Sequence, residues 1–243
     1  LSVVGPMARS AADLSTAMDV IAGPLQAGLR ADLPADRGGA LDDYRVLVLT
    51  GHPLARVASS ISGAIDRLAG ALADRGTRVE ATGPLPDLEK MHQSYVDMLT
   101  TVISRGTPDA RPTSAHEWME LVDEQMRVTR AWRALFEDFD VVIAPTLGVP
   151  AFPLMDEPNW PARTLAIDGV ATPFGAQLGF PGLATFPRLP ATAVPIGEDE
   201  SGLPAGVHLI GATWDDRATL GLASPVQAGG MAGSGVSREK PYL

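Results

Sequence analysis

The sequence predicts an α/β fold, and three observations carry this prediction. Two apolar segments of strand length, 44–50 and 77–82, flank a stretch whose apolar residues recur at helical spacing. Such a strand–helix–strand unit is typical of parallel pairing with a right-handed crossover. Further apolar runs of strand length follow at 139–146 and 206–212. Finally, 45% of the 243 residues are hydrophobic and 20% are charged, which is the composition of a globular protein with a core.

One helix and one loop are expected before the first strand, and two long helices after the second. The first helix should begin after Ser10, whose side chain can cap it, and should end at Gly23. Residues 24–43 are rich in Gly, Pro and Asp and predict a loop. The two longer helices are expected over 87–105 and 114–138, where apolar side chains repeat at helical spacing.

The last third of the chain is expected to be less regular. Residues 147–173 hold five prolines and should wind over the surface as an irregular connection. Five elements should follow: a short helix near 174–180, a strand near 191–196, a turn at 198–204, the strand 206–212 and a last helix from Asp215. The Gly- and Ser-rich residues 224–243 lack periodicity and are expected to form a separate tail.

Charge and composition argue against several classes of function. The formal net charge is −10, whereas nucleic acids and anionic membranes attract basic surfaces. The chain has no cysteine, which excludes a disulfide framework, a thiolate nucleophile and cysteine-bound metals. Its apolar runs are all too short to span a membrane. We therefore expect a cytoplasmic protein that needs no metal or other cofactor and binds neither nucleic acid nor membrane.

Three segments carry a resemblance to a known family. They are GPMARSAADLSTAMDVIAGP (5–24), FDVVIAPTLGVPAFPL (139–154) and GLATFPRLPATAVPIGEDESGLPAGVHLIGATWDDRATLGLA (182–223). In this order they resemble the amidase signature family, serine hydrolases that cleave carboxamides. The resemblance extends over about residues 1–223 and is weakest over 24–138. It implies the C-terminal part of one large α/β/α domain, with a mixed sheet and helices on both faces.

The resemblance also implies where the chemistry should come from. Members of the family use a Ser–Ser–Lys arrangement, in which a neutral lysine takes a proton through one serine and a second serine attacks the amide. Those three residues precede the family's equivalent of segment 5–24. We therefore expect no catalytic residue in this chain, and an incomplete domain over 1–223 that needs a missing N-terminal part. A homodimer is also implied.

Two other interpretations stay open at this point. The chain could be a non-catalytic relative that serves as a binding or scaffold subunit. It could also be a free-standing α/β domain that binds a ligand and has only a superficial resemblance to the family.

The serines, lysines and histidines of the chain itself lack catalytic surroundings. Lys90 lies in a charged helix start, where water keeps it protonated. Ser59 and Ser60 begin a helix and lack the flanking glycines of an oxyanion site. His116 begins a half-match to a zinc-binding helix, but Glu120 stands where the second histidine should be, so we expect no metal site.

The remaining candidates are weaker. Ser234 and Lys240 lie in the tail, where no strand or helix frames them. His208 lies within a predicted strand and should be buried and hydrogen-bonded, and His92 should lie at the surface. His52 follows a predicted strand in a turn, a place that can line a ligand site.

Residues at the end of the strand 139–146 are the best candidates for substrate binding. Ligands of open α/β sheets gather beyond the carboxyl ends of strands, which predicts that Thr146 and Leu147 line a pocket. Phe174 and Gln177, on the helix expected to face this edge, are the next candidates. Each also has a structural interpretation, such as a turn cap for Thr146 or plain core for Phe174. Trp160 is either a lid residue or a surface anchor.

Overall fold

The computed structural model describes residues 1, 3–23, 33–36, 40–108, 110–199 and 202–228. Its main feature is a five-stranded sheet with the order β2-β1-β3-β7-β6. The strands are β1 (Arg45–Val48), β2 (Arg78–Glu80), β3 (Val141–Pro145), β6 (Ala191–Glu198) and β7 (Pro204–Gly211). β1 pairs in parallel with β2 and β3, whereas β7 pairs antiparallel with β3 and β6. The predicted strands and the mixed sheet are thereby confirmed.

The helices follow the expected order. They are α1 (Ala11–Ile21), α2 (Ser59–Ala73), α3 (Leu88–Ile103), α4 (Ala115–Asp138), α5 (Gly179–Thr185) and α6 (Asp216–Ala228). Three short 3₁₀ helices are η1 (Leu41–Asp43), η2 (Trp160–Ala162) and η3 (Phe174–Leu178). Local sequence sets the boundaries: the hydroxyl of Ser10 accepts from the backbone N–H of Asp13 at the start of α1. At the start of α4, Ser114 and Glu117 form a reciprocal capping box.

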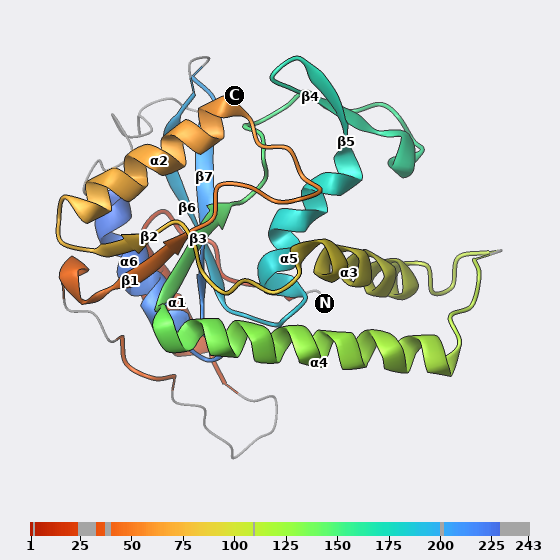
Figure 1. Ribbon diagram of the computed structural model, residues 1–243, viewed down its shortest axis with the longest axis horizontal. Coiled ribbons are helices and arrows are strands. Elements are labelled where there is room, and N and C mark those ends of the chain that lie inside the picture. Colours follow the sequence, from red (N-terminus) through yellow and green to blue (C-terminus); the bar gives the residue numbers. More distant parts are fainter. Residues whose placement is uncertain (2, 24–32, 37–39, 109, 200–201, 229–243) are drawn as a thin grey trace.

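Helices cover both faces of the sheet. Successive residues of β3 alternate between two buried clusters: Val141 and Ile143 belong to one, and Val142 and Ala144 to the other. The first cluster packs the sheet against α2 and α6, and the second packs it against α3, α4 and α5. Figure 1 shows these two groups of helices on opposite sides of the strands. The α/β/α arrangement that the sequence predicted is therefore present.

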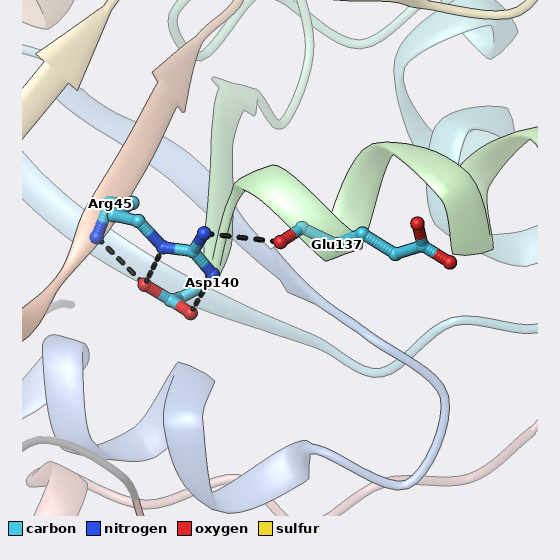
Figure 2. A network of polar contacts seen from close by, with 3 residues as sticks. All are labelled: Arg45, Glu137 and Asp140. Carbon is cyan, nitrogen blue, oxygen red and sulfur yellow. Dashed lines mark hydrogen bonds and ion pairs between the residues drawn. The ribbon is translucent and has the colours of Figure 1, made fainter.

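An ion pair fixes the register of β1 and β3 at their amino ends (Figure 2). The backbone N–H and Nε of Arg45 donate to Oδ2 of Asp140 at 2.8 and 3.2 Å, and Nη2 donates to Oδ1 at 2.9 Å. A third guanidinium contact, from Nη1 to the carbonyl of Glu137 at 3.1 Å, reaches the last turn of α4. The hydrogen bond to Asp140 raises the pKa of Arg45. One side chain thus joins two strands and a helix.

The expected irregular connection over 147–173 is wrong in its second half. β4 (Thr164–Ile167) and β5 (Val170–Pro173) form a two-stranded antiparallel hairpin apart from the main sheet. Its turn residues, Asp168 and Gly169, have φ values of 48° and 76°, as a type I′ turn requires. An Asp-Gly pair between two strand-like runs is a strong hairpin signal. The same segment also holds five prolines, which disfavour paired strands.

The end of the chain departs from the prediction in one respect. α6 extends to Ala228, so residues 224–228 of the predicted tail are helical. The rest of that tail, with Ser234 and Lys240, lies outside the described residues. Across the described ranges, none of the helices combines the length and the apolar character needed to cross a bilayer.

Candidate functional site

The parallel strands β1 and β3 end at the same side of the sheet, which we call the carboxyl edge. Three segments meet there: the loop 49–58 after β1, the segment 146–155 after β3, and η3. β7 begins at this edge because its Val207 pairs with Pro145, the last residue of β3. Open α/β sheets bind ligands at this position. The carboxyl edge is therefore the candidate site.

A buried glutamine ties the three segments together. Gln177, which is 1% exposed, accepts from the N–H of Gly148 through Oε1 at 2.7 Å and donates from Nε2 to the carbonyl of Arg56 at 2.9 Å. The N–H of Ala58 donates to the carbonyl of Gly148 at 2.7 Å. The backbones approach so closely that a Cβ on Gly148 would collide with the carbonyl oxygen of Arg56. These contacts hold the loops in one arrangement.

All four predicted substrate-binding residues lie at the carboxyl edge. The hydroxyl of Thr146 donates to the carbonyl of Gly206 at 3.3 Å, which turns it toward the start of β7. Leu147 is half-buried next to Gly148, which Gln177 holds. Phe174 is half-buried in a group of aromatic side chains. Substrate binding by these four residues stays a prediction.

That group, the aromatic cluster, consists of Phe152, Trp160 and Phe174. Phe174 lies at its centre, with ring centroids 5.9 Å from Phe152 and 5.7 Å from Trp160. Both pairs meet edge to face, at interplanar angles of 69° and 79°. The indole of Trp160 also rests on Gly175, where a Cβ would lie 3.2 Å from the ring. Since its side chain is 40% exposed, Trp160 covers η3 while keeping contact with solvent.

The serine and lysine candidates have structural contacts. Nζ of Lys90 lies 2.8 Å from a carboxylate oxygen of Glu124, and the lysine side chain is 53% exposed. Ser59 binds Asp168 through its N–H at 3.0 Å and its hydroxyl at 3.3 Å, which caps α2 from the hairpin turn. Within the described ranges, no lysine and serine form a catalytic pair.

Two histidines from different elements, His52 and His92, lie side by side. The rings of His52 and His92 are 5.7 Å apart, edge to face, and Phe180 lies 5.9 Å from His52. His52 is 8% exposed, and its Nδ1 accepts from the N–H of Leu54 at 3.2 Å. Burial, together with the neighbouring His92, lowers the pKa of His52 to about 4. Both rings are therefore neutral at pH 7, since burial also lowers the pKa of His92.

The surface position predicted for His92 is wrong, because its Nδ1 is buried. A signal was available in the sequence: His92 follows Leu88 by four residues and precedes Tyr95 by three, and both of those face the core. His208 is largely buried in β7 as expected, and burial lowers its pKa to about 4. However, its Nδ1 has no hydrogen-bond partner among the described residues, contrary to the prediction.

In the part of the chain that the structure describes, His, Asp and Glu side chains do not form any group of three or more that could hold a metal ion.

Comparison with known proteins gives consistent matches. Residues 97–220, just over half of the chain, match the family model described as Amidase. The indoleacetamide hydrolase of Bradyrhizobium japonicum is 26% identical over 93% of this chain and 52% of its own length. One subunit of the glutamyl-tRNA(Gln) amidotransferase of Chlorobaculum parvum is 31% identical over 53% of this chain and 24% of its own length.

The structural comparison extends over nearly the whole chain. The crystal structure of the corresponding glutamyl-tRNA(Gln) amidotransferase subunit from Thermotoga maritima has a TM-score of 0.71 and 16% identity. That match covers 92% of this chain and 52% of the other. The fold is therefore shared. Where a match covers more than 90% of this chain, it covers only about half of the matched protein.

Proposed function

Because this chain belongs to the amidase family, we propose that it forms the C-terminal half of an amide hydrolase, which cleaves the C–N bond of a carboxamide. The observation that carries the proposal is the family match over residues 97–220. In addition, the alignments with the indoleacetamide hydrolase and with the Thermotoga maritima subunit cover only about half of those two proteins. In this proposal, residues 1–223 are one part of a single amidase domain.

The chain's own residues build the pocket in this proposal. Thr146 and Leu147 line it, since they follow the central strand at the carboxyl edge. Gln177 holds the walls in place through Gly148 and Arg56. The nucleophilic serine, the bridging serine and the lysine base come from the other half of the enzyme. The ion pair of Lys90 with Glu124 supports this division, because it gives Lys90 a structural contact on α4, outside the three segments of the carboxyl edge.

In this proposal, the other half of the enzyme packs against an open edge of the sheet. Among the described residues, β6 pairs only with β7, so its outer edge carries no strand. Ala191, Ala193 and Pro195 on one face of β6 are exposed. Near the start of the chain, Val4 and Met7 are 99% and 96% exposed. Apolar side chains beside an open edge favour contact with another polypeptide.

Co-expression tests the proposal directly. The chain is purified alone and together with the polypeptide encoded directly upstream of Leu1, and hydrolysis of aryl amides is measured for both. We expect turnover only from the pair, and loss of it with serine-directed reagents. Turnover by this chain alone would place the nucleophile here and contradict the proposal. An upstream polypeptide without a lysine and a serine pair would favour the binding or scaffold subunit instead.

The scaffold alternative has one observation in its favour. Two of the matched proteins are, by name, subunits of an amidotransferase, which makes each of them one component of a larger assembly. The same assay separates the alternatives, because a scaffold subunit binds its partner and adds no turnover.

Three further expectations belong to the proposal. The reaction needs no cofactor, since serine and lysine supply the nucleophile and the base. A chain without cysteine fits a reducing compartment, so we place the enzyme in the cytoplasm. A homodimer is supported by exposed apolar side chains at the tip of the α3–α4 pair, namely Ile103, Trp118 and Met119. Sedimentation of the joined halves measures its stoichiometry.

A further inference from the structure

Two side chains connect the loop 49–58 with η3, one from each segment. Gln177 reaches from η3 to the loop, where it donates to the carbonyl of Arg56. His52 reaches in the opposite direction, from the loop to the junction of η3 and α5. Both side chains are buried, with exposed fractions of 1% for Gln177 and 8% for His52. The same two segments are therefore bridged twice.

The imidazole ring of His52 lies directly against Gly179, the first residue of α5. A Cβ on Gly179 would lie 2.9 Å from Cε1, 3.0 Å from Nδ1 and 3.1 Å from Nε2 of that ring, so only glycine allows this approach. The N–H of Gly179 in turn donates to the carbonyls of Ala176 and Gln177. The ring therefore determines how closely the end of η3 approaches the loop.

The same ring also shapes the loop itself. Nδ1 of His52 accepts from the N–H of Leu54 at 3.2 Å, and the carbonyl of His52 accepts from the N–H of Ala55 at 3.3 Å. A side-chain acceptor bound to the N–H two residues later is the arrangement of an Asx turn, here with a ring nitrogen in place of the oxygen. This turn leads directly to Arg56, whose carbonyl is bound by Gln177.

These contacts require a neutral imidazole whose proton is on Nε2. An imidazolium carries an N–H on both nitrogens, so its Nδ1 could not accept from the N–H of Leu54. Burial of the ring and the neighbouring His92 both disfavour the charged form of His52. Among the described residues, His92 is the one titratable group whose charge acts on His52. The surroundings therefore keep the ring in the form that the turn needs.

Gly148 connects the two bridges to the residues proposed to bind the amide. Its N–H donates to Gln177, and its carbonyl accepts from the N–H of Ala58 at the end of the loop. Thr146 and Leu147 directly precede it. A shift of either the loop or η3 would therefore move the backbone of Thr146 and Leu147.

From these contacts we infer that His52 is a positioning residue of the proposed substrate pocket. Its neutral imidazole, with the proton on Nε2, holds the loop 49–58 against η3 and thereby holds Thr146 and Leu147 in place. The inference deepens the proposed function and rests on it for the role of those two residues in substrate binding.

The proton position on the ring is the first test, and it needs no hydrolysis. In the full chain labelled with nitrogen-15, long-range proton–nitrogen spectra at pH 7 distinguish the two ring nitrogens of a histidine. We expect an unprotonated Nδ1 and a protonated Nε2 for His52, assigned by the loss of its signals in His52→Asn. A proton on Nδ1 would contradict the inference.

Two variants separate the hydrogen bond to Leu54 from the filling of space. His52→Leu keeps much of the ring's volume without the acceptor, so the amide hydrogen of Gly148 should exchange about threefold to tenfold faster, as expected for one lost hydrogen bond. His52→Asn is smaller, but its side-chain oxygen can accept in an Asx turn, so the exchange rate should stay near that of the wild type. His116→Leu, at an exposed position on α4, is the control and should change nothing.

Kinetics of the joined halves connect the loop to substrate binding. In His52→Leu we expect the KM for an aryl amide to rise about threefold to tenfold while kcat stays near the wild-type value, because contacts made equally in ground and transition state are lost. His52→Asn should restore the wild-type KM. Thermal melts establish that each variant is folded, and the proton position in the wild type and the His52→Asn data stand if His52→Leu does not fold.

The outcomes separate this inference from the proposed function. If His52→Leu is closer to the wild type than His52→Asn, the ring only fills space and the inference is wrong. If the joined wild-type halves hydrolyse amides and neither folded variant changes KM, the proposed function stands and the inference fails. If the joined wild-type halves do not hydrolyse amides, the proposed function fails, and the exchange rate of Gly148 in the chain alone still decides whether His52 holds the loop against η3.

Discussion

At the scale of single residues, the candidate site depends on close backbone approaches that side-chain patterns do not encode. The sequence predicted Thr146 and Leu147 because an apolar strand ends there. It also predicted Gln177 as a substrate contact, but it did not predict the two hydrogen bonds that this side chain makes across 29 and 121 residues. Contacts between residues so distant in sequence follow from the tertiary fold and leave no local periodicity.

One glycine makes this dependence testable. Gly148→Ala places a Cβ against the carbonyl of Arg56 and within 2.8 Å of Oε1 of Gln177. We expect it to lower the free energy of unfolding by about 1–3 kcal/mol, the usual cost of overpacking. Gly51→Ala, in the loop after β1, is the control, because nothing lies within 4 Å of its Cβ. Urea unfolding measures the stability of both variants. Equal losses of unfolding free energy would show that the close backbone approach at Gly148 does not restrict which residue can stand there.

At the scale of elements, the periodicity of apolar residues predicted the main sheet and its helices. It did not predict the β4–β5 hairpin, whose formation depends on the residues of its turn. The helical spacing of apolar residues in α2 and α4 and the capping residue of α1 led directly to those helices. The hairpin of β4 and β5 was missed because its strands have four residues each and lie among prolines. In that context only the Asp168–Gly169 turn carries the signal.

The ion pair between β1 and β3 gives a prediction at this scale. Asp140→Asn removes a carboxylate that is 8% exposed, while its partner Arg45 is 34% exposed. We expect a loss of about 2 kcal/mol in unfolding free energy, below the value for a fully buried pair because solvent screens the arginine. Arg78→Gln breaks the exposed pair with Glu80 and should cost less than about 0.5 kcal/mol. Similar losses for the two variants would contradict a structural role for the Asp140 contact.

At the scale of the whole molecule, buried histidines couple global stability to pH. The folded-state pKa values of His52 and His208 are lowered to about 4 by burial, whereas an unfolded chain titrates its histidines at about 6.5. Between these values the unfolded state binds more protons, so stability falls as the pH decreases from about 6.5 to about 4. Below that window, these two groups add no further change.

Substitution of one histidine tests this coupling. His52→Gln should flatten the dependence of unfolding free energy on pH by up to about 1.4 kcal/mol per pH unit within the window. His116→Gln is the control, since His116 lies exposed on α4. Urea unfolding at pH 4.5, 5.5 and 7 gives the slopes. Parallel profiles for the wild type and His52→Gln would assign the pH dependence to other groups.

The strand order has a consequence for how the chain acquires its fold. β6 and β7 are neighbours in sequence and can form a hairpin early. In contrast, β3 pairs with β1, which lies nearly a hundred residues before it in the sequence. Because loop closure over such separations is slow, we expect β1 and β3 to pair later than β6 and β7 do. On the ribosome, β3 emerges with only its parallel neighbour already synthesised, and its second side stays open until β7 has been made as well.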